Sequence, residues 1–380
     1  MKLNHVMESA NRSLANITLA SGDQIELYVE ATVALDDRAD HWLFLMLPVS
    51  MMLGEDLEIS GKLSHSAIAA FDKAQAELLR GHPKMCPIKL KFDQSFDDSL
   101  PKLGDQRKVG LFFSGGLDST YASETINDID SLVLIWGFDI PAKNQKHWDL
   151  SLEFLEPYAK DIGRDLVVVK TNIRELSNGI LQWGGDYHGT ALSGVATALS
   201  PELRKMYVAA GFVRTEPVWG HSATLYSCYN TDSQEIEETD PVKRIAKAAA
   251  IGDNPRTTKV RACYRNITGL ANCGACKKCV RTRLEFELVK AKYRPLGLET
   301  TPKAIEILRN KLTYWDYLFY LEALGWARQN GFKGTLGPLI VVTATRVKSI
   351  FQIYFEKVLT RLGIEKPKKV KKRPKAKKKL

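Results

Sequence analysis

Residues 109–120 place two glycines, three hydroxyl side chains and one carboxylate between an apolar run and a helical pattern, in the sequence VGLFFSGGLDST. A strand that ends in a glycine pair directly before a helix gathers backbone N–H groups around a small concavity, with the positive end of the helix dipole behind them. Glycine also takes positive φ and lets the backbone approach an anion closely. The segment predicts a pyrophosphate-binding loop formed by Ser114, Gly115, Gly116, Leu117, Asp118, Ser119 and Thr120.

Asp118 is the unusual member of this loop, because polyphosphate repels a carboxylate. It makes chemical sense there if it caps backbone amides or holds Mg²⁺, so Asp118 is a candidate catalytic residue. The loop differs from the Walker pattern, which needs Gly-Lys-Ser/Thr, and from the dinucleotide pattern Gly-x-Gly-x-x-Gly. A Gly-Gly turn that arose by accident is the structural alternative.

Cysteines form the second candidate site. Four of the six follow the spacing C-x9-C-x2-C-x2-C, namely Cys263, Cys273, Cys276 and Cys279. Two overlapping C-x-x-C turns and one cysteine a loop away can bring four thiolates to one tetrahedral ion at about 2.3 Å. A reducing compartment disfavours disulfides, so a metal is the default. Zinc is favoured, while an iron–sulfur cluster and a coincidental spacing stay open.

The SGGLDS segment after a strand resembles the PP-loop of the ATP pyrophosphatase superfamily, whose members cleave ATP to AMP and pyrophosphate while adenylylating a carboxylate, amide or carbonyl oxygen. Together with the cysteine spacing, it is similar to the 7-cyano-7-deazaguanine synthase family, in which a four-cysteine zinc site lies beside the PP-loop domain. A weaker match is YSCYNTD at 226–232, where Cys228 and Asn230 replace the glycine and proline of the family's YSGY-P-D segment. The resemblance covers about residues 108–290.

The resemblance implies ATP, Mg²⁺ and Zn²⁺ as cofactors and a small-molecule or macromolecular acid as substrate. It also implies that residues 132–139 form the strand beside the adenine, so that residues 136–139 touch the nucleoside. An apolar strand followed by a turn at Gly137 explains these residues almost as well.

Apolar runs alternate with helical patterns from Lys108 onward. We expect strands at 109–113, 131–136, 166–169 and 206–210, and helices near 119–127, 148–163 and 190–199. This alternation predicts an α/β fold with a parallel sheet covered on both faces, here a doubly wound PP-loop (HUP-like) domain.

The segments on either side of the predicted PP-loop domain have a different pattern of apolar and polar residues. Residues 1–105 predict a small α+β domain, with strands at 14–20, 25–33, 42–47, 57–60 and 88–92 and a helix at 64–80. A linker at 95–107 leads into the PP-loop domain at 106–295, which carries the zinc knuckle at 263–279. A helical extension at 296–364, with helices at about 302–329 and 338–362, and a disordered basic tail at 365–380 complete the chain.

His188 opens an expected helix at the carboxyl end of the sheet, where open α/β folds bind ligands. It is therefore a candidate catalytic residue, as a phosphate ligand or general base, although a capping or packed histidine is an equal alternative. His221 invites the same argument. Lys170 and Asn172 end the third strand of the parallel sheet. The acidic residues at 235–240 could bind Mg²⁺, but a solvated acidic face is the better reading.

The 380 residues are 44% hydrophobic and 26% charged, as in ordinary soluble globular chains. Residues 366–380 contain ten Lys or Arg and no acid, so the net charge of +10 lies entirely in this tail and the remaining basic and acidic residues are equal in number. The tail could bind nucleic acid or an anionic surface non-specifically, or only solubilise the chain. The apolar runs are too short to span a membrane and the first 20 residues lack a signal-peptide core, which predicts a cytoplasmic protein.

Three functions remain open at this point. The leading one is an ATP-dependent ligase that adenylylates an acid for attack by a nitrogen nucleophile. A second is an RNA-modifying PP-loop enzyme, for thiolation or amidation, although its usual catalytic cysteine pair is absent here. A non-catalytic nucleotide-sensing or nucleic-acid-binding scaffold is the third. The oligomeric state is not predicted.

Overall fold

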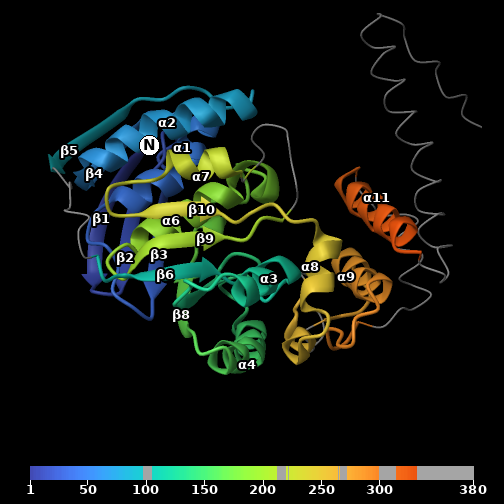
Figure 1. Cartoon of the computed structure of the whole chain (residues 1–380). Helices are drawn as coiled ribbons and strands as arrows, with labels where there is room; N and C mark the ends of the chain where they lie inside the picture. The colour runs from blue at the N-terminus through green and yellow to red at the C-terminus, as the bar shows by residue number, and fades with distance from the viewer. Residues whose placement is uncertain are drawn as a thin grey trace, which may run out of the picture. The chain divides into compact units, whose positions relative to one another are not determined.

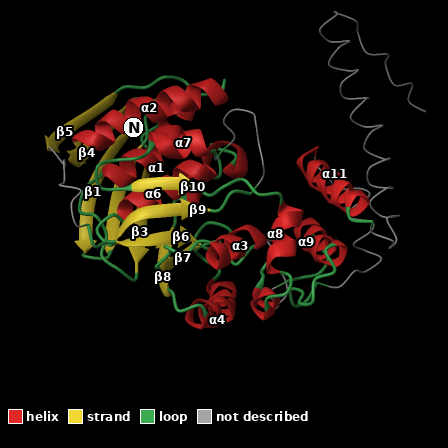
Figure 2. Ribbon diagram, viewed as in Figure 1, coloured by secondary structure: helices red, strands yellow, loops and turns green. Residues whose placement is uncertain are grey.

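A ten-stranded sheet is the centre of residues 1–300 in a computed structural model of the protein (Figures 1 and 2). The structure describes residues 1–96, 105–211, 220, 222–263, 265, 272–298 and 314–331. Residues 1–300 and 301–380 form two separate compact units.

The strands are β1 (Lys2–Ser9), β2 (Arg12–Thr18), β3 (Gln24–Ala31), β4 (Leu57–Ser64), β5 (Leu90–Phe96), β6 (Lys108–Phe112), β7 (Ser131–Trp136), β8 (Asp165–Thr171), β9 (Leu203–Val208) and β10 (Glu235–Glu238). The helices are α1 (Asp40–Leu53), α2 (His65–Gly81), α3 (Leu117–Thr125), α4 (Gln145–Asp161), α5 (Arg174–Ser177), α6 (His188–Ala198), α7 (Ala223–Cys228), α8 (Arg244–Ile251), α9 (Lys277–Leu288) and α11 (Tyr314–Gln329). Two short turns of other helix types are η1 (Trp183–Tyr187, π) and η2 (Pro255–Lys259, 3-10).

The sheet has the strand order β10-β9-β6-β7-β8-β3-β2-β1-β4-β5 and is mostly parallel. The predicted α/β class is therefore confirmed. The chain starts the parallel part at β6, adds β7 and β8 on one side and then β9 and β10 on the other. The order reverses between β6 and β9, and open α/β sheets bind ligands outside the carboxyl ends of the strands at such a point.

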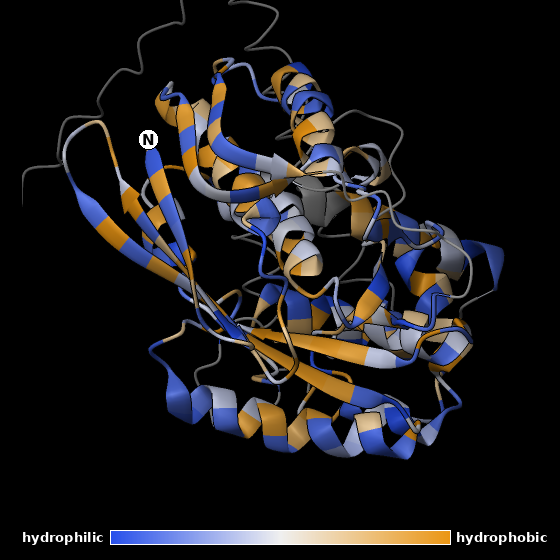
Figure 3. Ribbon diagram, turned by 90° about the vertical axis from the view of Figure 1, so that its left-hand side faces the viewer, coloured by the Kyte–Doolittle hydropathy of each residue, from blue (hydrophilic) through white to orange (hydrophobic). Residues whose placement is uncertain are grey.

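Burial along the strands follows their position in the sheet. β7 is buried along nearly its whole length, as expected of a strand covered on both faces. β2 and β3 instead alternate between more and less buried residues. In Figure 3, hydrophilic and hydrophobic residues alternate along the strand that begins at the N-terminus.

The N-terminal strands continue the sheet of the parallel part, because β3 pairs antiparallel with β8, with Val29 opposite Thr171 and Ala31 opposite Val169. One hydrophobic core also spans both parts and includes Leu3 and Trp42 together with Val169 and Tyr229. Residues 1–96 thus share a sheet and a core with the segment that follows the predicted linker, and they form no compact unit of their own.

The segment 42–47, predicted as a strand, is instead part of the helix α1. This prediction was wrong because the run HWLFLMLPVSMML is apolar on all sides and has no period that separates a buried strand from a buried helix. Nearly every residue of α1 is buried, and α1 packs against α6, which is also buried almost throughout. A Cβ on Gly194 would lie 2.5 Å from Leu45 Cγ, so a glycine is needed where the two helices meet.

The other predicted elements of this unit lie within a few residues of the observed ones, and β7 has the predicted bounds. β1 and β10 were not predicted. Among residues 301–380, the described part contains α11, which covers the second part of the helix predicted at 302–329; residues 302–313 lie outside the described residues. Tyr320, Ala323, Leu324 and Ala327 are buried at helical spacing on α11. The predicted helix at 338–362 and the basic tail lie outside the described residues. No helix in the described part of the chain is both long and apolar enough to cross a membrane.

Candidate functional site

The predicted phosphate loop connects β6 to α3 at the point where the strand order reverses. Gly115 has φ +72°, and a Cβ at this position would lie 2.5 Å from Leu155 Cδ2. The left-handed conformation therefore favours glycine, and a larger residue would also have to displace the Leu155 side chain. Gly116 is extended and precedes the first turn of α3, and its N–H donates to Ser114 Oγ over 3.3 Å. The strand, loop and helix are those that the sequence predicts.

The hydroxyl groups of the loop do not all face outward. Ser119 Oγ donates to the Gly116 carbonyl (3.2 Å), and Thr120 Oγ1 donates to the Gly115 carbonyl (3.4 Å); both side chains are buried. Their hydrogen bonds stabilise the loop on its buried side, whereas Ser114 is exposed. No side chain caps the N-terminus of α3 in the described structure, and the first amides of a helix have no partner within it. Anion binding here would fall to backbone amides and Ser114.

Asp118 has two cationic partners on α8. Its carboxylate accepts hydrogen bonds from Arg244 Nη1 and from Lys247 Nζ, the latter over 2.9 Å. Burial alone would raise the pKa of Asp118, but Arg244 and Lys247 outweigh burial and lower it. Arg244 also donates to Glu285 on α9 (3.2 and 3.3 Å), and Lys247 donates to the Ala210 carbonyl after β9. We call Asp118, Arg244, Lys247 and Glu285 the loop cluster.

The loop cluster changes the interpretation of Asp118. Neither of the expected roles, capping amides or binding Mg²⁺, matches the observed contacts, because both carboxylate oxygens accept from cations. Asp118 instead joins the start of α3 to α8. The sequence contains no local signal for this, since Arg244 and Lys247 are 126 and 129 residues away along the chain.

The four predicted metal ligands lie together. The Sγ atoms of Cys263, Cys273, Cys276 and Cys279 are all within 4.8 Å of one another, and those of Cys273 and Cys279 are 4.0 Å apart. A tetrahedral ion with bonds of about 2.3 Å requires sulfur atoms roughly 3.8 Å apart, so the cluster fits a metal such as zinc. Cys276 also accepts from Cys279 N (3.4 Å) and thereby caps α9.

Asn272 holds the first of these cysteines in place and was not predicted. Its Oδ1 accepts from the backbone N–H of Ala262 (2.7 Å) and Cys263 (3.2 Å), while its Nδ2 donates to the carbonyls of Val260 and Leu296, both over 2.9 Å. The side chain is buried. Its position directly before the C-x-x-C-x-x-C run is the only local signal that could have indicated it.

His188 lies at the carboxyl end of the sheet, beside the residues that follow β7. Its ring packs edge-on against Trp183 of η1, with centroids 5.2 Å apart. Asp139, after β7, is exposed, and its pKa is lowered because surrounding positive charge outweighs the opposing effect of desolvation. The groups responsible, in order, are Lys278, His188, Arg261 and Arg174. The structure thus brings His188 close to the strand that was predicted to contact a nucleoside.

Arg174 completes this part of the site. It donates to the Phe138 carbonyl (2.8 Å) and lies over the ring of Trp183, 4.5 Å from the centroid. Phe138 packs against Trp183 in turn, at 4.8 Å between centroids. The carboxyl end of β7 is therefore lined by aromatic rings and cations.

The remaining candidates have structural roles or lie outside the description. Asn172 bonds to the backbone of Tyr28 and Glu26 and so joins β8 to β3, and Lys170 lies over the Trp136 ring. Glu235 and Glu237 of β10 pair with Lys205, as a solvated acidic face would. Tyr226 and Tyr229, in the segment that weakly matched the family, are fully buried in the core. His221 lies outside the described residues.

Comparison of the chain with protein-family models, with curated proteins and with solved structures found no match.

Proposed function

We propose that the protein is an ATP-dependent ligase of the 7-cyano-7-deazaguanine synthase-like type, which cleaves ATP to AMP and pyrophosphate and forms a C–N bond. The observation that carries this proposal is the loop of Ser114, Gly115 and Gly116. It joins β6 to α3 where the strand order reverses, has a left-handed glycine, and leads into a helix N-terminus without a side-chain cap. These features suit the pyrophosphate part of ATP.

The proposed chemistry has two steps. A carboxylate or amide oxygen of the substrate attacks the α-phosphorus of ATP, the bond from that phosphorus to the bridging oxygen breaks, and pyrophosphate leaves with the bonding electrons. A nitrogen nucleophile then attacks the activated carbon, AMP leaves with the electrons of the C–O bond, and the nitrogen loses a proton. Both steps place negative charge on a phosphate leaving group, which preorganised amides stabilise.

Different residues of the chain would have different roles in these two steps. Backbone amides of the loop would hold the pyrophosphate, with Ser114 as a further donor, and Asp118 would keep the start of α3 fixed to α8. His188, close to Asp139 and Trp183, is the residue that we propose to accept the proton from the nitrogen nucleophile. We assign no step to magnesium, because Asp118 is engaged by Arg244 and Lys247. The cysteines would hold zinc in a structural role.

The test is the product of ATP cleavage. Purified protein, incubated with ATP, ammonia and a panel of carboxylic acids, should release AMP and pyrophosphate in equal amounts with the correct acid. His188→Gln should lower the rate of amide formation more than the rate of pyrophosphate release, because it acts only in the second step. Release of ADP and phosphate would contradict the proposal.

A further inference from the structure

The segment that enters the cysteine cluster also forms one side of the phosphate loop. The backbone N–H of Arg261 donates to the Gly115 carbonyl over 2.6 Å. A Cβ placed on Gly115 would lie 3.4 Å from Arg261 Cβ. The loop glycine is therefore hydrogen-bonded to a residue that lies two positions before the predicted metal ligand Cys263.

A second residue of the cluster reaches the same region. Lys278 lies between the ligands Cys276 and Cys279, in the first turn of α9. Lys278 and Arg261 both interact electrostatically with Asp139, which follows β7, the strand next to β6. Two cations from separate parts of the cysteine cluster thus converge on one carboxylate beside the phosphate loop.

The positions of both cations depend on the geometry of the cluster. Asn272, the residue before Cys273, forms hydrogen bonds with the backbone of Val260 and Cys263. Cys276 caps α9, the helix that carries Lys278. A metal bound by the four thiolates would close both segments into one rigid unit.

We propose that Arg261 and Lys278 bind the phosphates of the nucleotide beside Gly115, and that the metal cluster is the device that positions them. Metal binding and nucleotide binding would then strengthen each other. This inference rests on the proposed function, because it assumes a nucleotide at the phosphate loop. Coupling between two binding equilibria is reciprocal, so a bound nucleotide must also tighten metal binding, and we expect the tighter binding to appear as slower loss of the metal.

The experiment measures zinc and nucleotide separately. Zinc-loaded full-length protein is mixed with a chromogenic chelator, with and without α,β-methylene-ATP, an analogue whose α–β bridge is not cleaved. We expect the analogue to slow zinc release by roughly fivefold or more, the lower end of typical coupling between sites. The affinity for the same analogue is measured by calorimetry.

Adjacent lysines provide a matched control. Lys278→Ala should weaken analogue binding by about tenfold, the usual effect of losing one charge-assisted phosphate contact, and should abolish the protection of zinc. Lys277→Ala, which removes the neighbouring charge in the same turn, should change analogue affinity less than twofold. Arg261→Lys, which keeps the charge and the backbone hydrogen bond, should bind the analogue better than Arg261→Met. All four variants should retain the zinc content of the parent protein.

Two results would overturn the inference, and only the first of them would also overturn the proposed function. If zinc-loaded protein does not bind the analogue, the proposed function fails together with the inference. If the analogue binds but zinc release is unchanged and Lys278→Ala behaves like Lys277→Ala, the inference alone fails and the metal is only a remote structural element.

Discussion

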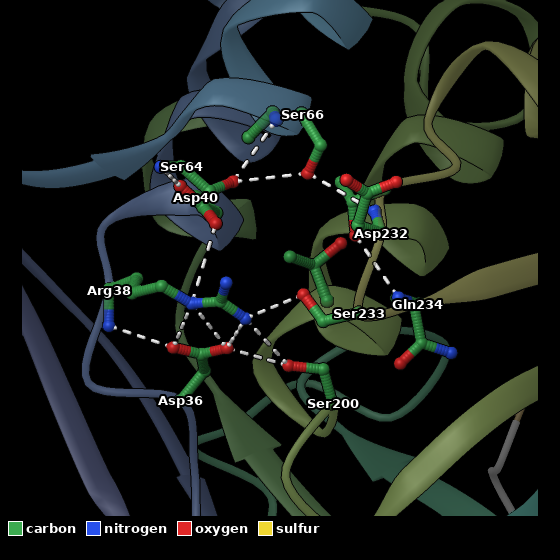
Figure 4. A network of polar contacts seen from close by, with 12 residues as sticks. Asp36, Arg38, Asp40, Ser64, Ser66, Ser200, Asp232, Ser233 and Gln234 are labelled. Carbon is green, nitrogen blue, oxygen red and sulfur yellow. Dashed lines mark hydrogen bonds and ion pairs between the residues drawn. The ribbon is translucent and has the colours of Figure 1, made fainter. Parts of the chain in front are cut away.

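Two buried clusters of carboxylates and cations differ in their balance of charge. The first, which we call the junction cluster, contains Asp36, Arg38 and Asp40 (Figure 4). Arg38 Nε lies 2.7 Å from Asp36 Oδ1 and 3.6 Å from Asp40 Oδ2, so two carboxylates share one guanidinium. In the loop cluster the ratio of carboxylates to cations around Asp118 is the reverse, because this single carboxylate is paired with both Arg244 and Lys247.

Burial and the neighbouring cations together set the ionisation of Asp40 and Asp118. Asp40 is almost completely buried, and burial raises its pKa to about 6 despite the opposing effects of Arg38 and Ser64. The pKa of Asp118 is lowered instead, because two cations more than offset its burial. Burial thus favours a proton on Asp40 of the junction cluster, whereas the two cations beside Asp118 keep that carboxylate of the loop cluster ionised.

The two clusters also serve different purposes. The junction cluster joins distant parts of the chain: Ser200 donates to Asp36 over 2.6 Å, and Arg38 donates to Ser233 over 2.8 Å (Figure 4). The loop cluster holds the first turn of α3 beside the phosphate loop. A buried ion cluster can therefore act as a structural joint or, as we propose for the loop cluster, support an anion site.

Loss of the metal should break the loop cluster and spare the junction cluster. Cys276→Ser should remove the zinc, which we expect at about one per chain, and should destabilise α9 together with the Glu285 that α9 carries, by several kcal/mol. Elemental analysis gives the metal content, and amide hydrogen exchange locates the damage. Exchange should accelerate in α8 and α9 but not in β1–β3. Cys86→Ser, at an exposed cysteine outside the cluster, is the control. Uniform acceleration through the whole sheet would contradict the separation of the two clusters.

Removal of one cation should have the next largest effect. Arg244→Met leaves Asp118 with Lys247 alone and leaves Glu285 buried without its principal partner, which should lower the free energy of unfolding by about 3–5 kcal/mol. Urea denaturation measures the change. Lys108→Met, which breaks the exposed pair with Asp165, should change the free energy of unfolding far less, because water screens that pair. Equal losses in the two variants would show that burial of the loop cluster does not matter for stability.

A lower pH should increase the contribution of the junction cluster to the stability of the protein. Because the pKa of Asp40 is raised to about 6 in the folded protein, the folded state binds this proton more tightly than the unfolded state does. The contribution of Asp40 to the free energy of unfolding should therefore rise as the pH falls from about 6 to about 4, by about 3 kcal/mol in total. Asp40→Asn should remove this part of the slope, as measured by denaturation at several pH values. A slope that persists unchanged in the variant would exclude Asp40 as its source.

Deletion of the basic tail should have the smallest effect on either cluster. Removing residues 366–380 should leave zinc content, nucleotide affinity and stability unchanged within about twofold or 0.5 kcal/mol, because the remaining chain is formally neutral and its anion site would be built from the loop. Salt-dependent binding to nucleic acid or anionic vesicles should fall strongly, which a titration at several salt concentrations would show. Retention of that binding would place a non-specific anion surface elsewhere in the chain.

The sequence alone determined the features that depend on neighbouring residues. The strand, loop and helix around Gly115, the strand β7 and the gathering of the four cysteines were predicted correctly, because glycine conformation, apolar runs and C-x-x-C turns act over a few positions. Phosphate binding by the loop stays a prediction. The amphipathic helix α2 was predicted nearly to its bounds for the same reason, with buried residues at helical spacing.

Only the tertiary structure decided what depends on distant partners. The apolar segment of α1 became a helix because α6 covers it, and no local period could show this. The pairing of β3 with β8 joined the N-terminal strands to the parallel sheet across about 140 residues of chain. Asp118 was recognised from its motif, but its partners on α8 were not. Hydrogen bonds and ion pairs are set by where side chains meet in space, and that follows from packing of the whole core rather than from any short stretch of sequence.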